Sequence, residues 1–512
     1  MTQADVILIG DVVTMSPGQP RAEAVAVKDG AIVAVGTACE VSALESPATR
    51  VIDCRRWTVV PGFIDAHCHI LASAAARLSV DCSPRAVRSI ADIQARIRNR
   101  KNELPDGAWI RAVGYNEFYL REKRHPNCHD LNQAVPTSPV RLIHRSGHAC
   151  VLNSLAMSLI GIDASTEDPP GGIIERDLTG EPTGLLLGAM DYWDRYLPRL
   201  GEGDVVQGVS IFGNELLAGG VTSVVDATAT NSYDEWRVLD GFCRSGYLKS
   251  RVSMMVGPES MGDFCECGAA FGTMGMVRLA GVKIVVDETT GEVFPASDDL
   301  EGALMSAHMA GFQTVLHAVE GRPLEAAVNA LTMILSKAPK VDHRHRIEHC
   351  SLCPPEIRRH LKELGLVVVS QPAFIYQNGE RYLQTVASRE IPCLYPFGAL
   401  VGDGVVVAAG SDSPTGAVNP LIGICAAVTR KTENGEVVGA EQKLEPEMAL
   451  ALYTRDAAYA TFGEGSFGTL TPGKRADMVV LSDDPLSCPH DALGNIRIEI
   501  TLVDGRVVYE GG

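Results

Sequence analysis

Short apolar runs recur along the middle of this 512-residue chain, and segments of helical character lie between them. This alternation is typical of a parallel sheet or barrel, in which each strand leads into a helix. Eight such units close a TIM-like (β/α)8 barrel, and we predict that α/β fold. The chain has one run more than eight, so we expect the run at 140–144 to lie in an insertion. The predicted strands are at residues 59–69, 140–144, 221–226, 251–256, 282–286, 314–317, 346–348, 366–370 and 405–409.

The two ends of the chain have a different pattern, with short strand-like runs and tight turns. Asp29-Gly30 and Asp504-Gly505 are each typical of a two-residue hairpin turn. A few strands with exposed edges are not stable alone, so we expect both ends to meet in one small β-sandwich. The predicted domains are a β-sandwich of residues 1–60 plus 465–512, and a barrel with insertions at 61–464. The strand-like runs are at 6–9, 24–27, 31–35, 476–481 and 496–503.

Composition and charge exclude several classes of protein. The chain has 45 basic and 63 acidic residues, a net charge of −18, and its basic residues are scattered, so we expect no nucleic-acid partner. The first residues lack both a basic segment and a long apolar run, so we expect no signal peptide and no membrane span. The fourteen cysteines are dispersed, which favours reduced thiols in a cytoplasmic enzyme.

Two histidines end the first barrel run. His67 and His69 are two residues apart, and side chains with this spacing point to the same side of a strand. Two imidazoles directed at one point are suited to a divalent metal, above all zinc. Two histidines with this spacing and no other ligand nearby would more often face solvent. The prediction of a metal site therefore depends on ligands from elsewhere in the chain.

Further residues of metal-binding type occur within or just after other predicted strands. The carboxyl ends of all barrel strands open onto one face, so residues far apart in sequence become neighbours there. We expect one metal on His67, His69 and Asp412, and a second on His317 and His349. Lys283 would bridge the two zinc ions if its amine is carboxylated, which first requires the neutral amine that burial favours.

Each of these residues also has a structural alternative. Asp412 is suited to capping a turn or a helix, helped by Pro414. Lys283 is suited to an ion pair with Asp287 or Glu288. Taken singly, a histidine near a strand end is a core or surface residue. Only the joint placement of all the ligands at strand ends favours a metal site.

The same blocks resemble those of the amidohydrolase superfamily, in the type-3 branch that includes N-substituted formamide deformylases. The resemblance extends over nearly the whole chain, and it implies a metal-dependent barrel that cleaves carbon–nitrogen bonds without fixing the substrate. The blocks are at 61–69, 147–154, 171–175, 281–284, 315–318, 346–349, 410–414 and 468–477.

Two segments depart from the branch. After His317 the branch usually has Ala-Ile-Gly-Asp, whereas this chain has Ala-Val-Glu-Gly, which places Glu320 as in the deaminase arm of the superfamily. The segment at 285–291 also lacks the usual Asp-Gly-rich continuation. We expect both segments near the barrel mouth, where they would alter selectivity before they altered the fold.

Other residues are candidates for contact with substrate. His148 lies in one of the family blocks, and an imidazole there is suited to a substrate carbonyl or carboxylate, with a hydrogen bond inside the core as the alternative. Glu320, Tyr115, Phe374 and Tyr376 are candidates to line the pocket. By contrast, the polar segment at 342–346 predicts that His343 and His345 are solvated at the entrance of a strand.

These residues predict a hydrolase of a small, non-peptide amide or formamide, active as a homo-oligomer, most simply a dimer. Asp412 would accept a proton from water and later deliver it to the leaving amine, with His148 as a second candidate catalytic residue. One alternative is a one-metal aminohydrolase of a nitrogen heterocycle, in which Glu320 moves protons. Another is a non-catalytic scaffold, whose signature would be a missing ligand, and none is missing.

Overall fold

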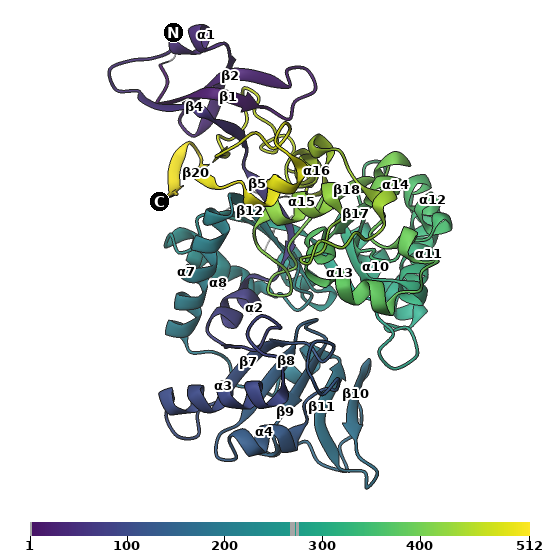
Figure 1. Ribbon diagram of the computed structural model, residues 1–512. Coiled ribbons are helices and arrows are strands. Elements are labelled where there is room, and N and C mark those ends of the chain that lie inside the picture. The colour runs from purple at the N-terminus through teal and green to yellow at the C-terminus, as the bar shows by residue number, and fades with distance from the viewer. Residues whose placement is uncertain (1–2, 267–271, 273–275, 512) are drawn as a thin grey trace. The chain divides into compact units, whose positions relative to one another are not determined.

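The computed structural model describes residues 3–266, 272 and 276–511, and they form two compact units (Figure 1). The first unit comprises Met1–Ile70, Val209–Val286 and Ser297–Gly512, and the second comprises Leu71–Gly208 and Asp287–Ala296. Barrel and terminal strands both belong to the first unit. The predicted domain boundaries near residues 60 and 465 stay a prediction.

Eight parallel strands of the first unit form one sheet, in the order β18-β17-β16-β15-β14-β13-β12-β5. The predicted TIM-like α/β fold is therefore confirmed. The ninth predicted run, at 140–144, pairs in a sheet of the second unit. The barrel strands are β5 (Phe63–Cys68), β12 (Val221–Asp226), β13 (Arg251–Val256), β14 (Val277–Val285), β15 (Thr314–Ala318), β16 (Arg346–His349), β17 (Val367–Ser370) and β18 (Val406–Ala409).

The barrel closes between β18 and β5 through the residues that follow β18. A Cβ on Gly410 would lie 2.5 Å from the backbone nitrogen of His67, so only glycine permits this approach. Ser411 donates from its backbone N–H and its hydroxyl to the buried carboxylate of Asp65, at 2.8 and 2.6 Å. The Asp412 N–H then donates to the carbonyl of His67 at 2.7 Å. Closure therefore places Asp412 beside the histidines of β5.

Helices follow the barrel strands and lie outside them, as Figure 1 shows for α10, α11 and α12. In α11, Leu324, Ala327, Leu331 and Ile334 recur at helical spacing and are buried, which is the amphipathic pattern of a helix packed on a sheet. The helices of this unit are α1 (Ala38–Ser42), α8 (Tyr233–Arg244), α9 (Met261–Glu266), α10 (Ser297–Met309), α11 (Gly321–Lys337), α12 (Pro355–Glu363), α13 (Ala373–Thr385), α14 (Phe397–Gly402), α15 (Pro420–Thr429), α16 (Pro446–Leu452) and α17 (Arg455–Ala460).

The chain ends form a seven-stranded mixed sheet, in the order β21-β20-β19-β4-β1-β2-β3. Asp29-Gly30 and Asp504-Gly505 join its two predicted hairpins, and all four residues have positive φ, as a type I′ turn requires. Leu8, from one chain end, and Leu502, from the other, share one core. The strands are β1 (Val6–Val13), β2 (Arg21–Lys28), β3 (Ala31–Gly36), β4 (Arg50–Pro61), β19 (Met478–Leu481), β20 (Ile498–Val503) and β21 (Arg506–Glu510).

The second unit has a six-stranded sheet, in the order β10-β11-β9-β8-β7-β6, in which β6, β7 and β8 are parallel. Its strands are β6 (Val80–Asp81), β7 (Ile110–Tyr115), β8 (Val140–His144), β9 (Ala149–Leu152), β10 (Gly172–Arg176) and β11 (Pro182–Gly188). Its helices are α2 (Ile70–Arg77), α3 (Ile90–Glu103), α4 (Cys128–Ala134), α5 (Ser154–Ile160) and α6 (Met190–Asp194), and α7 (Glu202–Ala218) leads back to the first unit.

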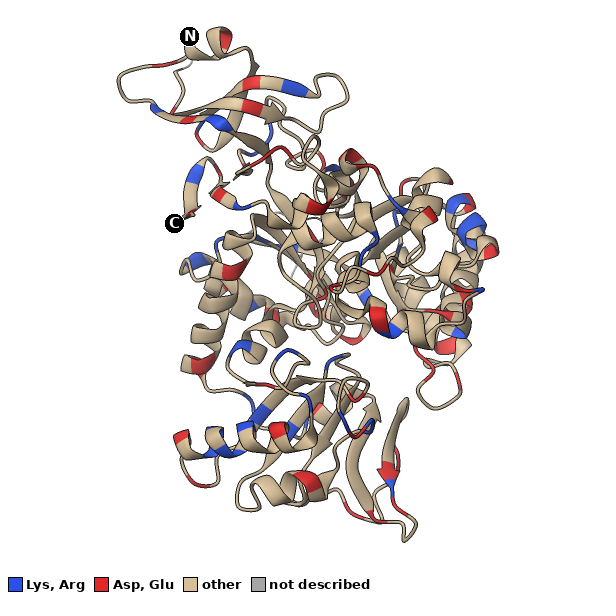
Figure 2. Cartoon of the chain, viewed as in Figure 1, with Lys and Arg blue, Asp and Glu red and all other residues tan. Residues whose placement is uncertain are grey.

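Three further expectations concern the chain as a whole. Among the described residues, no helix is both long and apolar enough to cross a membrane. Acidic and basic residues are interspersed along both units in Figure 2, in keeping with the scattered basic residues of the sequence. The cysteines of the described part are free thiols.

The prediction for His343 and His345 was wrong. Both are buried before β16, where His345 is fully inaccessible and its Nδ1 accepts from the backbone N–H of Thr314 at 3.0 Å. Burial lowers the pKa of His345 to about 2, so the ring is neutral. The sequence around these histidines is polar and resembles a solvated loop. The two rings are buried nonetheless, because backbone groups and the imidazole of His308 satisfy their nitrogens.

Candidate metal centre

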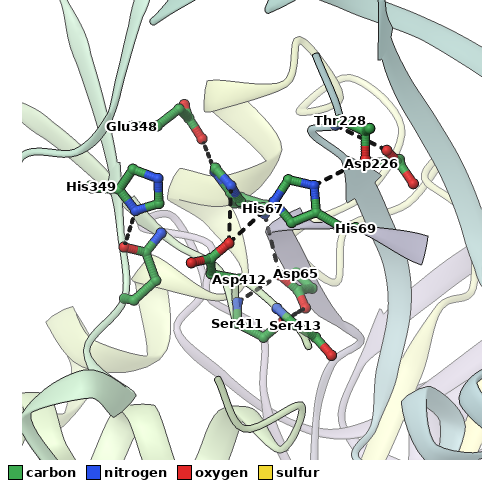
Figure 3. A network of polar contacts seen from close by, with 12 residues as sticks. Asp65, His67, His69, Asp226, Thr228, Glu348, His349, Ser411, Asp412 and Ser413 are labelled. Carbon is green, nitrogen blue, oxygen red and sulfur yellow. Dashed lines mark hydrogen bonds and ion pairs between the residues drawn. The ribbon is translucent and has the colours of Figure 1, made fainter. Parts of the chain in front are cut away.

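His67, His69 and Asp412 converge at the carboxyl end of the barrel (Figure 3). The Oδ1 atom of Asp412 lies 3.2 Å from Nε2 of His69 and 3.5 Å from Nε2 of His67. One possible ligand atom from each residue lies within 4.8 Å of the others. Ligands at about 2.1 Å from a tetrahedral zinc ion are roughly 3.4 Å apart. The spacing and the donor types therefore fit a divalent cation held among the three side chains.

The second ring nitrogen of each of three histidines already has a partner. Nδ1 of His67 contacts the carboxylate of Glu348, which can only accept, so this nitrogen carries a hydrogen and Nε2 is the nitrogen left for a metal. Burial and Lys283 would lower the pKa of His67, but Glu348 and Asp412 raise it. Nδ1 of His69 lies 3.0 Å from the Thr228 hydroxyl, and Nδ1 of His349 lies 2.9 Å from Oε1 of Gln371. Partners of this kind orient metal-ligating imidazoles and fix their tautomers.

Glu348 is a site residue that the sequence analysis missed. Its side chain is fully buried, and Arg346 donates to its two carboxylate oxygens at 2.8 and 2.9 Å. Burial would raise the pKa of Glu348, but Arg346 and His67 outweigh it and hold the pKa far below its usual range. Its position directly before the predicted ligand His349, two residues after Arg346 in one buried strand, was the signal in the sequence that could have revealed it.

Lys283 lies within β14 and is buried. Its Nζ has no hydrogen-bond partner among the described residues. Burial lowers the pKa of this amine to about 8, although the charges of Glu348 and Asp412 oppose the change. A buried lysine with a pKa near neutrality has an appreciable fraction of neutral amine, which is the form that can react with carbon dioxide.

His349 and His317 lie beside each other, with ring centroids 4.3 Å apart, and the His349 ring is 5.0 Å from that of His67. Burial lowers the pKa of His349 to about 3, so its imidazole is neutral. Burial would raise the pKa of Asp412, but His67 and His69 hold it well below its usual value. The site therefore combines the neutral imidazole of His349 with the ionised carboxylate of Asp412.

The backbone at this end of the barrel is strained. His349 and Asp412 have φ of 70° and 53°, in the left-handed region that residues other than glycine rarely adopt. Such conformations cost roughly 1–3 kcal/mol each and concentrate at functional sites. The backbone conformations of these two predicted ligands therefore reduce the stability of the folded protein.

The remaining predicted site residues of the first unit differ in how exposed they are. Glu320 is exposed at the start of α11, and Tyr376 is half-buried, with its carbonyl accepting from the Glu433 N–H at 2.9 Å. Phe374 is buried against the segment that follows Asp412, since a Cβ on Gly416 would lie 2.9 Å from its ring. Phe374 therefore packs against the segment that follows a predicted ligand.

Tyr115 and His148 belong to the second unit. Tyr115 is fully buried, and its hydroxyl lies 2.9 Å from Nδ1 of His125, whereas His148 is exposed. Their assignment to substrate binding stays a prediction.

The eight-stranded parallel barrel, with histidines and an aspartate converging at its carboxyl end, defines a TIM-type metal-dependent hydrolase. The model of the amidohydrolase family matches residues 50–509, so this chain belongs to the amidohydrolase family. It is similar to the N-substituted formamide deformylase of Arthrobacter pascens, with 30% identity over 100% of this chain and 99% of the relative.

Solved structures share the fold. An uncharacterized metal-dependent hydrolase from Pyrococcus horikoshii OT3 gives a TM-score of 0.76 at 22% identity, over 95% of this chain and 99% of the other. An adenosine deaminase from Xanthomonas campestris with bound zinc gives a TM-score of 0.59 at 16% identity, over 99% and 93%. At these identities the likeness shows the fold and leaves the substrate open.

Proposed function

We propose that this chain hydrolyses the carbon–nitrogen bond of a small, non-peptide amide, with N-substituted formamides as the first candidates. The observation that carries the proposal is the convergence of His67, His69 and Asp412, with a buried Lys283 amine on the same barrel. The printed name of the Arthrobacter relative suggests the formamide type.

The donor set suggests which residues would hold metal. His67, His69 and Asp412 would hold one zinc ion, and we assign a second to His317 and His349, because neutral imidazole nitrogens and carboxylates are zinc ligands. Lys283 would bridge them as a carbamate, in which Nζ bonds to the carbon of carbon dioxide and loses one proton. When bound, the metals supply Lewis acidity and a nucleophile at neutral pH.

Asp412 is the proposed proton carrier. Its low pKa keeps it ionised at neutral pH, so it can accept a proton from the attacking water. The same carboxyl group then delivers this proton to the nitrogen of the leaving amine, and the carboxylate is restored. In the proposal Phe374 and Tyr376 line the pocket, and substrate contact by His148 and Tyr115 stays a prediction.

A one-metal aminohydrolase is the second candidate. It is favoured by Glu320, three residues after His317, a spacing that would let a carboxylate move protons at a ring nitrogen. The exposed position of Glu320 and the buried Lys283 amine support the amide hydrolase instead.

Metal content and product chemistry together test the proposal. For the amide hydrolase we expect two zinc ions per chain by elemental analysis, and release of a carboxylic acid and an amine from N-substituted formamides, N-acyl amines or cyclic amides. Ammonia released from amino-substituted heterocycles, with one metal per chain, would support the aminohydrolase. A folded chain with near-zero metal and no turnover would support the scaffold.

Lys283→Ala tests the proposed bridge. We expect loss of turnover that added short carboxylic acids partly restore, because their carboxylate can take the place of the carbamate. A plain, uncarboxylated amine at residue 283 in a crystal structure of the fully metallated, active protein would contradict the bridge and reduce the expected metal count to one.

A further inference from the structure

A Glu–His–Ser chain of contacts lies in the second unit. Tyr115 ends β7 and is the register partner of His144, which ends the neighbouring parallel strand β8. Glu117 follows β7, and Ser146 follows β8. The carboxyl ends of adjacent parallel strands are the usual position of binding and catalytic residues in α/β sheets.

Ser146 contacts His144, and His144 in turn contacts Glu117. The Ser146 Oγ lies 2.8 Å from Nδ1 of His144, and Nε2 of His144 lies 2.9 Å from Oε2 of Glu117. Both Nε2 and Oε2 are buried, and Oε2 also lies 4.0 Å from Nδ1 of His125. Edge-to-face contact with the Tyr115 ring, at 5.1 Å between centroids, fixes the imidazole from one side.

The backbone determines the tautomer of His144. The Ser146 N–H donates to Nδ1 at 3.2 Å, so this nitrogen carries a lone pair and the ring hydrogen is on Nε2, next to the carboxylate. The Ser146 hydroxyl can then donate to the same Nδ1, while its oxygen accepts from the His148 N–H at 3.2 Å. Serine, imidazole and carboxylate thus have the hydrogen arrangement of an acyl-transfer triad.

The charges agree with this arrangement. Burial would raise the pKa of Glu117, but the neighbouring His144 outweighs it and lowers the pKa to about 2, so the carboxylate is ionised. Burial lowers the pKa of His144 against the opposing effect of Glu117, so the ring is a neutral base. Ser146 is half-buried, and the next two residues are exposed.

We propose that Ser146 is an activated nucleophile that accepts acyl groups from activated esters, a second activity separate from carbon–nitrogen hydrolysis. Oγ bonds to the ester carbonyl carbon as its proton passes to Nδ1 of His144, and the ester C–O bond breaks as the leaving alcohol takes that proton. Water then cleaves the acyl-serine by the same route, which releases the acid and restores the hydroxyl. The site uses residues of the second unit alone.

Covalent labelling of the full-length, metal-loaded protein with a fluorophosphonate tests the proposal, because Ser146 Oγ would displace fluoride and retain the phosphonyl group. We expect one adduct per chain, assigned to Ser146 by peptide mass spectrometry, and none in Ser146→Ala. Glu117→Gln should label at least about tenfold more slowly, since the carboxylate stabilises the imidazolium.

Two variants serve as matched controls. Ser154→Ala should label as the wild type does, because the Ser154 hydroxyl accepts from the Asn132 amide at 2.7 Å and has no imidazole partner in the described part of the chain. Asp412→Asn should also keep the label, which separates this site from the proposed carbon–nitrogen chemistry. The absence of a Ser146 adduct in the wild-type protein, under conditions that saturate a serine hydrolase, would overturn the proposal. This result does not depend on whether any variant folds. An unchanged labelling rate in folded Glu117→Gln would overturn it as well.

Discussion

Two histidine clusters lie at opposite ends of the same barrel strands, and β16 joins them, because His345 precedes it and His349 ends it. At the amino end, His308 Nδ1 lies 2.8 Å from His345 Nε2, and His308 Nε2 lies 2.8 Å from the Ala338 carbonyl. The ring nitrogens of His345 contact Thr314 and His308, so both are used within the protein.

At the carboxyl end the pattern of partners is different. His67, His69 and His349 each have Nδ1 held by a side chain, and their neighbours there include the ionised carboxylate of Asp412. Nε2 of His67 and of His69 face that carboxylate. The partner of the second ring nitrogen therefore separates a candidate ligand from a structural histidine, and neither burial nor position along a strand does so alone.

The largest effect that tests this comparison is expected from His69→Ala. We expect turnover to fall to background and the protein to lose metal, because one of three converging ligands is gone, while the urea midpoint of unfolding stays near that of the wild type. Elemental analysis, an amide hydrolysis assay and urea titration measure these quantities.

His308→Ala is the matched variant at the other end of the barrel. We expect metal content to be kept, and about 1–3 kcal/mol of unfolding free energy to be lost, because His345 Nε2 is left without its partner. His360→Ala, on the exposed side of α12, controls for loss of any histidine. Equal metal loss in His69→Ala and His308→Ala would contradict the distinction between the clusters.

Asp412→Asn is expected to have the next largest effect. The amide has nearly the same size and can still approach a cation, but it cannot accept the proton of water. General acid–base catalysis is worth about 10²–10⁴ in rate, so we expect a loss of this order in kcat with a smaller change in KM. A variant that keeps more than roughly a tenth of the wild-type kcat would exclude Asp412 as the proton carrier, and Glu320 and His148 would then be tested.

Glu348→Gln tests whether the partner of Nδ1 matters. Loss of the charge-assisted contact to His67 should weaken metal binding by about 10–100-fold, the usual effect of removing such a partner. Chelator competition on the folded variant measures this affinity. Thr228→Val removes the hydroxyl partner of the more exposed His69 at nearly constant volume, so we expect a smaller loss. Equal affinity in Glu348→Gln and the wild type would show that the buried acid serves stability alone.

Much of the barrel was predictable because its strands are apolar runs bounded by polar turns. The predicted runs at 221–226 and 251–256 match β12 and β13 residue for residue, and the extra run at 140–144 belongs to another sheet. The run at 59–69 was wrongly taken as one strand. Its first part belongs to the terminal sheet and its second to the barrel, and they separate at Gly62, where a Cβ would lie 2.2 Å from the Thr222 hydroxyl.

The predicted ligands could be read from residue type and strand position, whereas their partners could not. Glu348 meets His67 across 281 positions of sequence, and Gln371 and Thr228 act through contacts that only the closed barrel creates. His343 and His345 were misjudged for the same reason. Their sequence is polar, but their ring nitrogens bond to backbone groups and, for Nε2 of His345, to the imidazole of His308.

The smallest expected effect concerns pH and the buried cluster at the amino end of the barrel. Burial lowers the pKa of His345 to about 2 in the folded protein, against an ordinary value of 6.5, so the unfolded chain binds more protons between these values. Stability should therefore fall as pH falls below about 6.5, by up to about 1.4 kcal/mol per pH unit for this one group, or roughly 2 kcal/mol between pH 6.5 and pH 5. His345→Gln keeps an acceptor and a donor but cannot titrate, so the slope of its unfolding free energy against pH should be smaller than that of the wild type by this amount. Urea titrations at several pH values compare the slopes, with His360→Gln as the exposed control. Equal slopes for the wild type and His345→Gln would mean that His345 binds its proton equally well in the folded and unfolded chain. The histidines at the two ends of the barrel would then differ less in their protonation than their hydrogen bonds indicate.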